Sequence, residues 1–269
     1  MENNFMIAIT LTVLAGLSTG IGSIIGLIAK KTNTKFLSVA LGFSAGVMLF
    51  VSFVDIYPKA NDMLLNQLNE NLSGWLTMIG FFTGIVVIAI VDSLLPKDTN
   101  NHNDIIENIN NEKIKDPKNT KALLRMGIFT ALAIGIHNFP EGLATFMATL
   151  ADPSLGVPIA VAIALHNIPE GLAVSVPIYY ATGSRKKAFF YSFLSGIAEP
   201  VGALIGYIIL RPFLNDIVMG MIFSAVGGIM IYISLDELLP AAKRYGKPAI
   251  AKIGLVLGML VMAISLQLL

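Results

Sequence analysis

Apolar stretches long enough to cross a membrane recur along the whole chain. An α-helix needs about 20 predominantly apolar residues to span a hydrocarbon layer roughly 30 Å thick. Eight stretches meet this requirement, at approximately 5–29, 36–57, 74–95, 122–149, 156–180, 187–210, 214–239 and 249–268. The pattern therefore predicts an all-α fold, a polytopic membrane helix bundle with eight transmembrane helices in a single domain over 1–269.

Composition agrees with a chain that is surrounded mainly by lipid. Of its 269 residues, 55% are hydrophobic and only 13% are charged, whereas soluble domains carry about 25% charged residues. Too few polar side chains remain to cover a water-soluble globule. The net charge of +1 gives no general attraction to nucleic acid. The absence of Cys excludes disulfides and thiolate metal ligands.

Positive charges predict the orientation of the helices. Basic residues in short loops stay on the cytoplasmic side of a membrane, and all Lys and Arg residues except Lys59 and Arg211 fall near alternate loops. The N and C termini are therefore expected outside the cytoplasm. No basic residue precedes the first apolar stretch, so we expect it to be a retained helix and not a cleaved signal peptide.

One long polar segment, 97–121, separates the first three apolar stretches from the last five. It is rich in Asn and lacks aromatic residues, which is typical of a flexible linker. The charge pattern places this loop in the cytoplasm. His102 lies within it, either as a solvated side chain or as a residue that gathers metal weakly.

One motif occurs twice. The pattern His-Asn-x-Pro-Glu-Gly-Leu-Ala begins at His137 in the fourth apolar stretch and again at His166 in the fifth. Because consecutive transmembrane helices run in opposite directions, the two copies are expected to be antiparallel. Such inverted repeats are typical of alternating-access carriers.

A weaker repeat relates the second apolar stretch to the seventh. The matched positions are Gly46, Met48, Ser52, Asp55 and Pro58 with Gly228, Met230, Ser234, Glu237 and Pro240. The two stretches are also expected to be antiparallel, which extends the inverted repeat beyond the central motif.

The spacing within the motif favours metal binding. His137 and Glu141 stand at positions i and i+4, as do His166 and Glu170, so each pair lies on one face of a helix, one turn apart. The proline between them has no N–H and disturbs the preceding turn, which is tolerated at membrane depth where the helix lines a cavity. With Asn138 and its equivalent in the second copy, the motifs offer two imidazoles, two carboxylates and two amide oxygens. One or two divalent ions would fit this donor set.

A third acid lies in the sixth apolar stretch, where Glu199 precedes a proline. Uncompensated, Glu141, Glu170 and Glu199 would together cost about 7 to 10 kcal/mol near the bilayer centre. These stretches contain no Lys or Arg to pair with the acids at that depth, so protons or metal cations must neutralise them. Metal that displaces protons would bind more weakly as the pH falls.

The duplicated motif, the eight stretches and the long third loop resemble the ZIP (Zrt/Irt-like) metal transporters, most closely their bacterial ZupT-like branch. The resemblance implies uptake of Zn²⁺, with Fe²⁺, Mn²⁺, Co²⁺ and Cd²⁺ as further candidates, across the cell membrane into the cytosol through a binuclear site. The positions that match the family's metal ligands are His137, Asn138, Glu141, His166, Asn167, Glu170, Glu199 and Met48. For Met48, a packing role is the alternative.

Four further acids lie toward the ends of the apolar stretches. Asp55 falls near the outer end of the second stretch, where it would collect cations at an entrance. Asp92, Asp236 and Glu237 fall at inner ends, within two copies of Asp-x-Leu-Leu-Pro, where they would form a release site. For each acid the alternative is a solvated carboxylate at the membrane surface.

The expected partners are the lipid bilayer and divalent metal ions, with a homodimer left open. The metal is a transported substrate and not a cofactor. The competing class of protein is an intramembrane metal-dependent hydrolase, which requires an open coordination position and a base beside a bound water. Because the chain lacks His-Glu-x-x-His and its motif is duplicated in antiparallel form, a carrier is the better interpretation and an enzyme is not expected.

Overall fold

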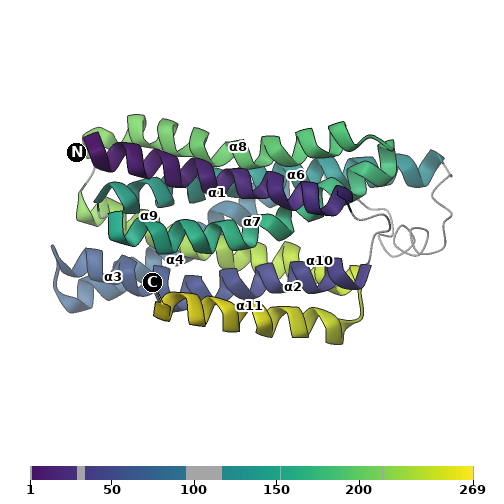
Figure 1. Ribbon diagram of the computed structural model, residues 1–269. Helices are drawn as coiled ribbons and strands as arrows, with labels where there is room; N and C mark the ends of the chain where they lie inside the picture. The colour runs from purple at the N-terminus through teal and green to yellow at the C-terminus, as the bar shows by residue number, and fades with distance from the viewer. Residues whose placement is uncertain (1, 29–33, 95–116, 152, 214, 269) are drawn as a thin grey trace.

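A computed structural model describes residues 2–28, 34–94, 117–151, 153–213 and 215–268. The side chains of some residues within these ranges, His137 among them, lie outside the description. The described residues form ten α-helices (Figure 1), which are α1 (Glu2–Ile28), α2 (Thr34–Val51), α3 (Tyr57–Leu65), α4 (Glu70–Leu94), α6 (Pro117–Ala151), α7 (Pro153–Thr182), α8 (Arg185–Leu210), α9 (Asp216–Ile233), α10 (Leu239–Tyr245) and α11 (Pro248–Leu268). Three short elements join them: π-helical η1 (Ser52–Ile56) and η3 (Ser234–Leu238), and 3-10 helix η2 (Arg211–Phe213).

The all-α, polytopic membrane architecture is confirmed. Within the described residues, seven helical segments are long and apolar enough to cross a membrane: Asn4–Ile28, Lys35–Leu65, Glu70–Ser93, Gly156–Thr182, Arg185–Ile209, Asp216–Lys243 and Pro248–Gln267. The long helix α6 packs among them but is not one of the seven. Eight transmembrane helices and external termini stay predictions, although both termini lie at the same end of the bundle (Figure 1).

Most of the predicted cytoplasmic loop, 97–121, lies outside the described residues, and so does His102. Its last part, 117–121, forms the beginning of α6.

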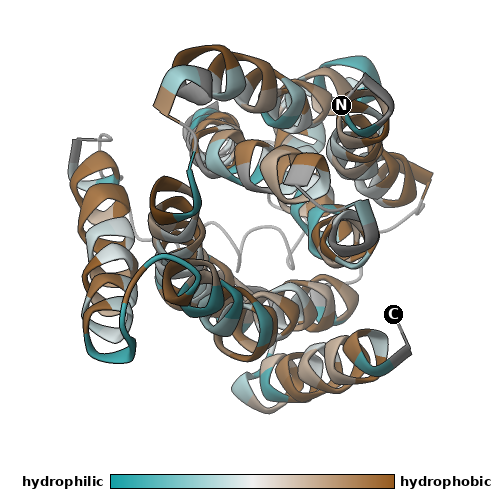
Figure 2. Ribbon diagram, turned by 90° about the vertical axis from the view of Figure 1, so that its left-hand side faces the viewer, coloured by the Kyte–Doolittle hydropathy of each residue, from teal (hydrophilic) through white to brown (hydrophobic). Residues whose placement is uncertain are grey.

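The helices form two groups. In the first, which we call the four-helix bundle, α1, α6, α7 and α8 pack against one another. In the second, which we call the two helix pairs, α2 packs along α11 and α4 packs along α9. Contact between α2 and α7 joins the two groups. Figure 2, which looks along the helices, shows hydrophobic residues on the outward sides of both groups. Large exposed side chains such as Trp75, Ile208 and Val256 belong to this apolar surface, which suits contact with lipid chains.

The weaker repeat predicted between the second and seventh apolar stretches has a structural counterpart. The π-helical segments η1 and η3 begin at the matched residues Ser52 and Ser234, one after α2 and the other after α9. The helices that follow them, α3 and α10, lie at opposite ends of the molecule, so α2 and α9 run in opposite directions (Figure 1). A π-helical turn inserts one extra residue into a helix and often marks a functional position.

Candidate metal site

The two motif copies lie on neighbouring helices, α6 and α7, which pack against each other. Neither Pro140 nor Pro169 ends its helix. Because proline has no N–H, each one leaves the carbonyl one turn earlier without its usual helical hydrogen bond. The polarity of both helices is thus raised near the point where the motif begins.

The glycine after each motif glutamate allows a close helix crossing. A Cβ atom at Gly142 would collide with the backbone of Glu199 on α8, and a Cβ atom at Gly171 would collide with the backbone of Thr19 on α1. Close approach of this kind requires glycine. The motif glutamates, Glu141 and Glu170, are therefore each next to a close helix crossing. The crossing partners, α8 and α1, are the two helices that we call the outer helices of the four-helix bundle.

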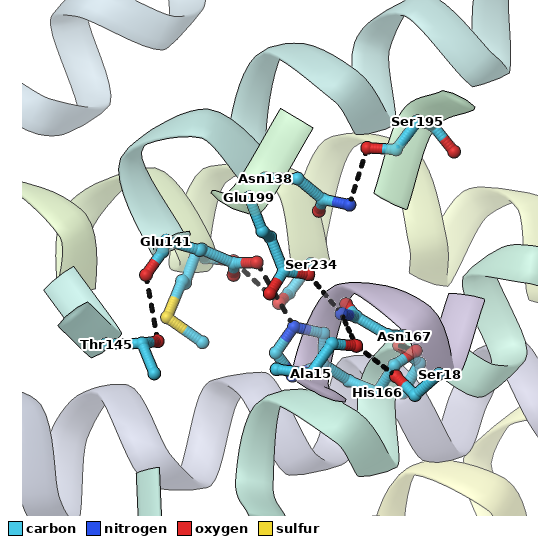
Figure 3. Close-up of polar contacts among 12 residues, drawn as sticks. Ala15, Ser18, Asn138, Glu141, Thr145, His166, Asn167, Ser195, Glu199 and Ser234 are labelled. Carbon is cyan, nitrogen blue, oxygen red and sulfur yellow. Dashed lines mark hydrogen bonds and ion pairs between the residues drawn. The ribbon is translucent and has the colours of Figure 1, made fainter. Parts of the chain in front are cut away.

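These crossings bring side chains from three helices together (Figure 3). The His166 Nε2 atom on α7 lies 3.4 Å from Glu141 Oε2 on α6. The Asn167 side-chain amide donates to Glu199 Oε1 on α8 and to the Ala15 carbonyl on α1, the latter at 3.0 Å. The predicted residues Glu141, His166, Asn167 and Glu199 therefore occupy one place in the fold.

Asn138 occupies a corresponding position on α6. Its side-chain amide donates to the Ser195 carbonyl on α8 at 3.2 Å, as Asn167 donates to Ala15 on α1 (Figure 3). Both asparagines thus use their nitrogen to bond a neighbouring helix. Within the described part of the chain, their Oδ1 atoms have no hydrogen-bond partner, and these oxygens are suitable metal ligands.

The site is fully removed from solvent. The described polar side chains of the two motifs and Glu199 are at most 1% exposed: Asn138, Glu141, His166, Asn167, Glu170 and Glu199. Glu141 and Glu170 are both close enough to act electrostatically on Glu199. No Lys or Arg occurs between Arg125 and Arg185. Buried charges need partners, and this arrangement favours a cation.

The described side chains hydrogen-bond to one another and do not converge as a complete set of ligands. No group of three or more His, Asp or Glu side chains in the described residues has a metal-binding arrangement. The two Asn Oδ1 atoms are further donors beside these side chains, and the His137 side chain lies outside the described residues. The described part of the donor set therefore consists of two contacting pairs, Glu141 with His166 and Asn167 with Glu199.

Two methionines lie close to this site. Met48 is fully buried on α2, one turn beyond Ser44, whose hydroxyl donates to the His166 carbonyl at 3.2 Å. Its repeat equivalent, Met230 on α9, lines a small cavity together with Glu141. Sequence reasoning noted that Met230 matches Met48 but did not place it at the site. Both thioethers belong to the apolar core, so the packing role of Met48 stays an alternative.

The cavity beside Glu141 lies between the two groups of helices. It measures about 20 Å³, the room of roughly one water molecule. Apart from Glu141, its lining is apolar: Val51, Ile56, Ile159, Ala162, Ile163, Phe223, Val226 and Met230. Ile56 is the residue after Asp55 and belongs to η1. Glu141 lines the cavity with the carbon atoms of its side chain, so the cavity lies between the stem of this glutamate and the η1 segment.

The four predicted entrance and exit acids are less buried than the motif residues. Asp55, in η1, forms an ion pair with Lys59, whose Nζ lies 2.8 Å from Oδ1. Asp92, at the end of α4, accepts a hydrogen bond from the Tyr232 hydroxyl at 3.4 Å. Asp236 and Glu237 belong to η3 and also act electrostatically on Tyr232. The structure therefore brings the three predicted exit acids near one tyrosine, and Asp55 belongs to a separate segment, η1.

Sequence reasoning missed the contribution of α1. The Ala15 carbonyl accepts from Asn167, and the Thr19 backbone packs against Gly171. A signal was present, because the glycines of α1 recur in α8 at the same spacing: Gly16, Gly22 and Gly26 match Gly196, Gly202 and Gly206. This match extends the inverted repeat to the first helix.

A membrane helix bundle with antiparallel copies of one motif around buried acids is the arrangement of a carrier for cations. The sequence model of the family described as "ZIP Zinc transporter" matches residues 92–266. The chain belongs to this family.

Individual relatives match over their full length. The "Zinc transporter ZupT" of Lysinibacillus sphaericus (strain C3-41) is 59% identical over 270 residues and covers 100% of both chains. The protein of the same name from Streptococcus mutans serotype c is 59% identical over 268 residues, covering 100% of this chain and 99% of its own. That of Clostridium perfringens is 54% identical over 280 residues, covering 99% and 97%.

Proposed function

We propose that this protein takes up Zn²⁺ across the cell membrane into the cytosol, with Fe²⁺, Mn²⁺, Co²⁺ and Cd²⁺ as further substrates. The names of its relatives support zinc transport. The observation that carries the proposal is the burial of Glu141, Glu170 and Glu199 beside His166, in helices without a Lys or Arg at that depth. Imidazole and carboxylate together suit first-row divalent metals and discriminate loosely among them.

The ligands of this proposed site come from both motif copies and from α8. Glu141 and His166 lie 3.4 Å apart and would hold one ion between α6 and α7. Glu199, whose Oε1 accepts from Asn167, would hold an ion from the side of α8. His137, Asn138, Glu170 and Met48 complete the donor set that the family resemblance implies. A site with this many carboxylates has room for two ions, and binding would release protons.

A route to and from this site follows from the acids at the helix ends. Asp55 would attract a hydrated cation near η1, and the apolar cavity beyond Ile56 would admit it to Glu141 only after the cavity widens. The ion would leave past Asp92, Asp236 and Glu237, which surround Tyr232 at the other end. Apolar constrictions of this type keep a carrier closed until it changes conformation.

Family membership argues against the intramembrane hydrolase, because the matched relatives are transporters and not enzymes. The metal is accordingly cargo. A homodimer stays a hypothesis, which crosslinking of two tagged copies in the same membrane would test.

The proposal is tested by uptake of radiolabelled Zn²⁺ into proteoliposomes. We expect the intact chain to accumulate zinc and Glu141→Gln to lower the initial rate by about 100-fold, since loss of a metal-associated group costs roughly 10- to 100-fold. Glu70→Gln is the matched control, because Glu70 is exposed at the start of α4. Uptake by Glu141→Gln equal to that of the control would refute the site.

A further inference from the structure

Contacts of α1 and α8 with the motif helices repeat in pairs. The Asn167 amide on α7 donates to the Ala15 carbonyl on α1, and the Asn138 amide on α6 donates to the Ser195 carbonyl on α8. The match that relates Gly16 to Gly196 also relates Ala15 to Ser195, and the motif repeat relates Asn167 to Asn138. The two outer helices of the four-helix bundle are therefore structural equivalents.

The same match identifies the α1 residue that corresponds to Glu199. Gly171 on α7 packs against the backbone of Thr19, and its equivalent on α6, Gly142, packs against the backbone of Glu199. Thr19 and Glu199 thus hold equivalent places at equivalent crossings. Where α8 carries a carboxylate, α1 carries a hydroxyl.

The Thr19 hydroxyl is buried and lacks the hydrogen bond that helical threonines usually make. Thr12 and Thr145 each donate to the carbonyl one turn earlier, at 2.9 Å. For Thr19 that acceptor is the Ala15 carbonyl, which already accepts from Asn167 and, at 2.5 Å, from Ser18. Thr19 is 0% exposed, and among the described residues its Oγ1 has no hydrogen-bond partner. A buried polar atom in that state is costly unless a ligand uses it.

The hydroxyl faces α8 near the site. A Cβ atom built on Gly196 would lie 3.0 Å from Thr19 Oγ1, so the oxygen occupies the space that this glycine leaves. Gly196 is one turn before Glu199 on α8. On α1, Thr19 is one turn beyond Ala15, the residue that Asn167 contacts. Thr19 is therefore one turn from the Ala15 carbonyl that binds Asn167, and its oxygen faces α8 one turn before Glu199.

We propose that Thr19 Oγ1 is an oxygen donor to the transported cation, the counterpart of Glu199 in the other half of the site. This inference rests on the proposed metal site. It makes the two halves unequal, because the half with Glu199 carries one more negative charge than the half with Thr19. The ion on the Thr19 side is consequently the weaker bound, which favours its release.

The experiment measures Zn²⁺ binding to the full-length protein in lipid nanodiscs by equilibrium dialysis. Thr19→Val removes the hydroxyl but keeps the shape of the side chain. We expect it to raise the dissociation constant of the more weakly bound of the two Zn²⁺ ions by about tenfold. Thr19→Ser is expected to recover most of that loss. Thr19→Asp, which places a carboxylate where the repeat has one, is expected to strengthen binding of the same ion. The last two variants keep the test decisive if Thr19→Val does not fold.

Ser23 supplies the matched control. It lies one turn further along α1, is equally buried, and its Oγ also has no partner among the described residues. Its equivalent on α8 is the apolar Ala203, so Ser23→Ala is expected to bind Zn²⁺ as the unmodified protein does. Equal losses in Thr19→Val and Ser23→Ala, or no loss in Thr19→Val, would overturn the inference.

Glu199→Gln separates this inference from the proposed function. If Glu199→Gln loses zinc binding and Thr19→Val does not, the role of Thr19 alone is wrong. If both variants bind zinc normally, the metal site itself is wrong.

Discussion

The four-helix bundle and the two helix pairs are both built from apolar helices, but they place their acids differently. In the four-helix bundle, Glu141 is 1% exposed and Glu170 and Glu199 are 0% exposed. Beside the two helix pairs, the acids of the π-helical segments keep some exposure: Asp55 in η1 is 14% exposed, and Asp236 in η3 is exposed. An acid that keeps some exposure can retain part of its solvation, whereas a fully buried acid needs a cation. Burial therefore separates the acids that we propose bind the metal from the acids that we propose guide it.

The largest effect is expected from a change at the crossing of α6 and α8, which positions Glu141 and Glu199. Gly142→Val would drive a side chain into the backbone of Glu199. Because backbone cannot yield as a flexible side chain can, we expect almost complete loss of folded, active protein. The measurements are the yield of monodisperse protein and Zn²⁺ uptake.

Gly74→Val is the control for this crossing. Gly74 lies on α4, in the two helix pairs, and a Cβ there would have no neighbour within 4 Å. Folded yield is expected to stay within about twofold of the unmodified protein, since valine in a helix costs only a few tenths of a kcal/mol more than better helix formers. Similar losses in both variants would show that the crossing has no special importance.

The next effect concerns the second motif copy. Glu170→Gln removes one buried charge at constant size and should lower the initial rate of Zn²⁺ uptake by about 10- to 100-fold. Asp92→Asn, the same kind of change at a helix end in the two helix pairs, should lower it less. A larger loss of uptake rate in Asp92→Asn than in Glu170→Gln would show that the buried acids are not the more important group.

How far the sequence predicted the site can be judged from these residues. The duplicated motif was identified by its repeat and spacing, and Glu199 as an acid before a proline within an apolar stretch. The structure brings Glu141, His166, Asn167 and Glu199 together. The direction of the Asn amides was not predictable, because it depends on which carbonyls of α1 and α8 are within reach. The role of α1 was missed because its polar residues beyond Asn4 are Ser and Thr, which in an apolar helix are equally typical of packing.

The fold was predicted more fully than the site. Long apolar stretches specify membrane helices almost regardless of their partners, and the weaker repeat between the second and seventh stretches reappeared in the structure as η1 and η3. The sequence did not indicate the π-helical turns themselves. Nothing in the local pattern of 52–56 or 234–238 distinguishes a π-helix from an α-helix, because the extra residue is accommodated by tertiary packing.

A smaller effect is expected at the entrance. Asp55→Asn removes the charge that would attract cations near η1, although Lys59 already offsets part of it. Because charges on a solvated surface change local ion concentration modestly at physiological salt, we expect uptake at low Zn²⁺ concentration to fall by about two- to threefold. At saturating Zn²⁺ the rate should be unchanged. A loss that persists at saturation would place Asp55 in the transport step itself.

The smallest effect is expected for Asp236→Asn. Asp236 is exposed in η3, and Asp92 and Glu237 share its surroundings near Tyr232. Removal of one charge from this group of three acids should change the Zn²⁺ uptake rate by less than about twofold, because a single exposed charge contributes little interaction energy. Measurement of efflux from preloaded proteoliposomes, where this end would act as the entrance, provides the check. A change of about tenfold or more would mean that Asp236 binds the ion directly.

The buried cluster between α6, α7 and α8 is the place where we propose that the transported metal binds. The most direct test of this proposal is anomalous diffraction from crystals of the protein grown with Cd²⁺, which scatters strongly and is among the proposed substrates. We expect an anomalous peak within bonding distance of Glu141, His166 and Glu199. Strong peaks at the helix ends, with none between α6 and α7, would contradict it.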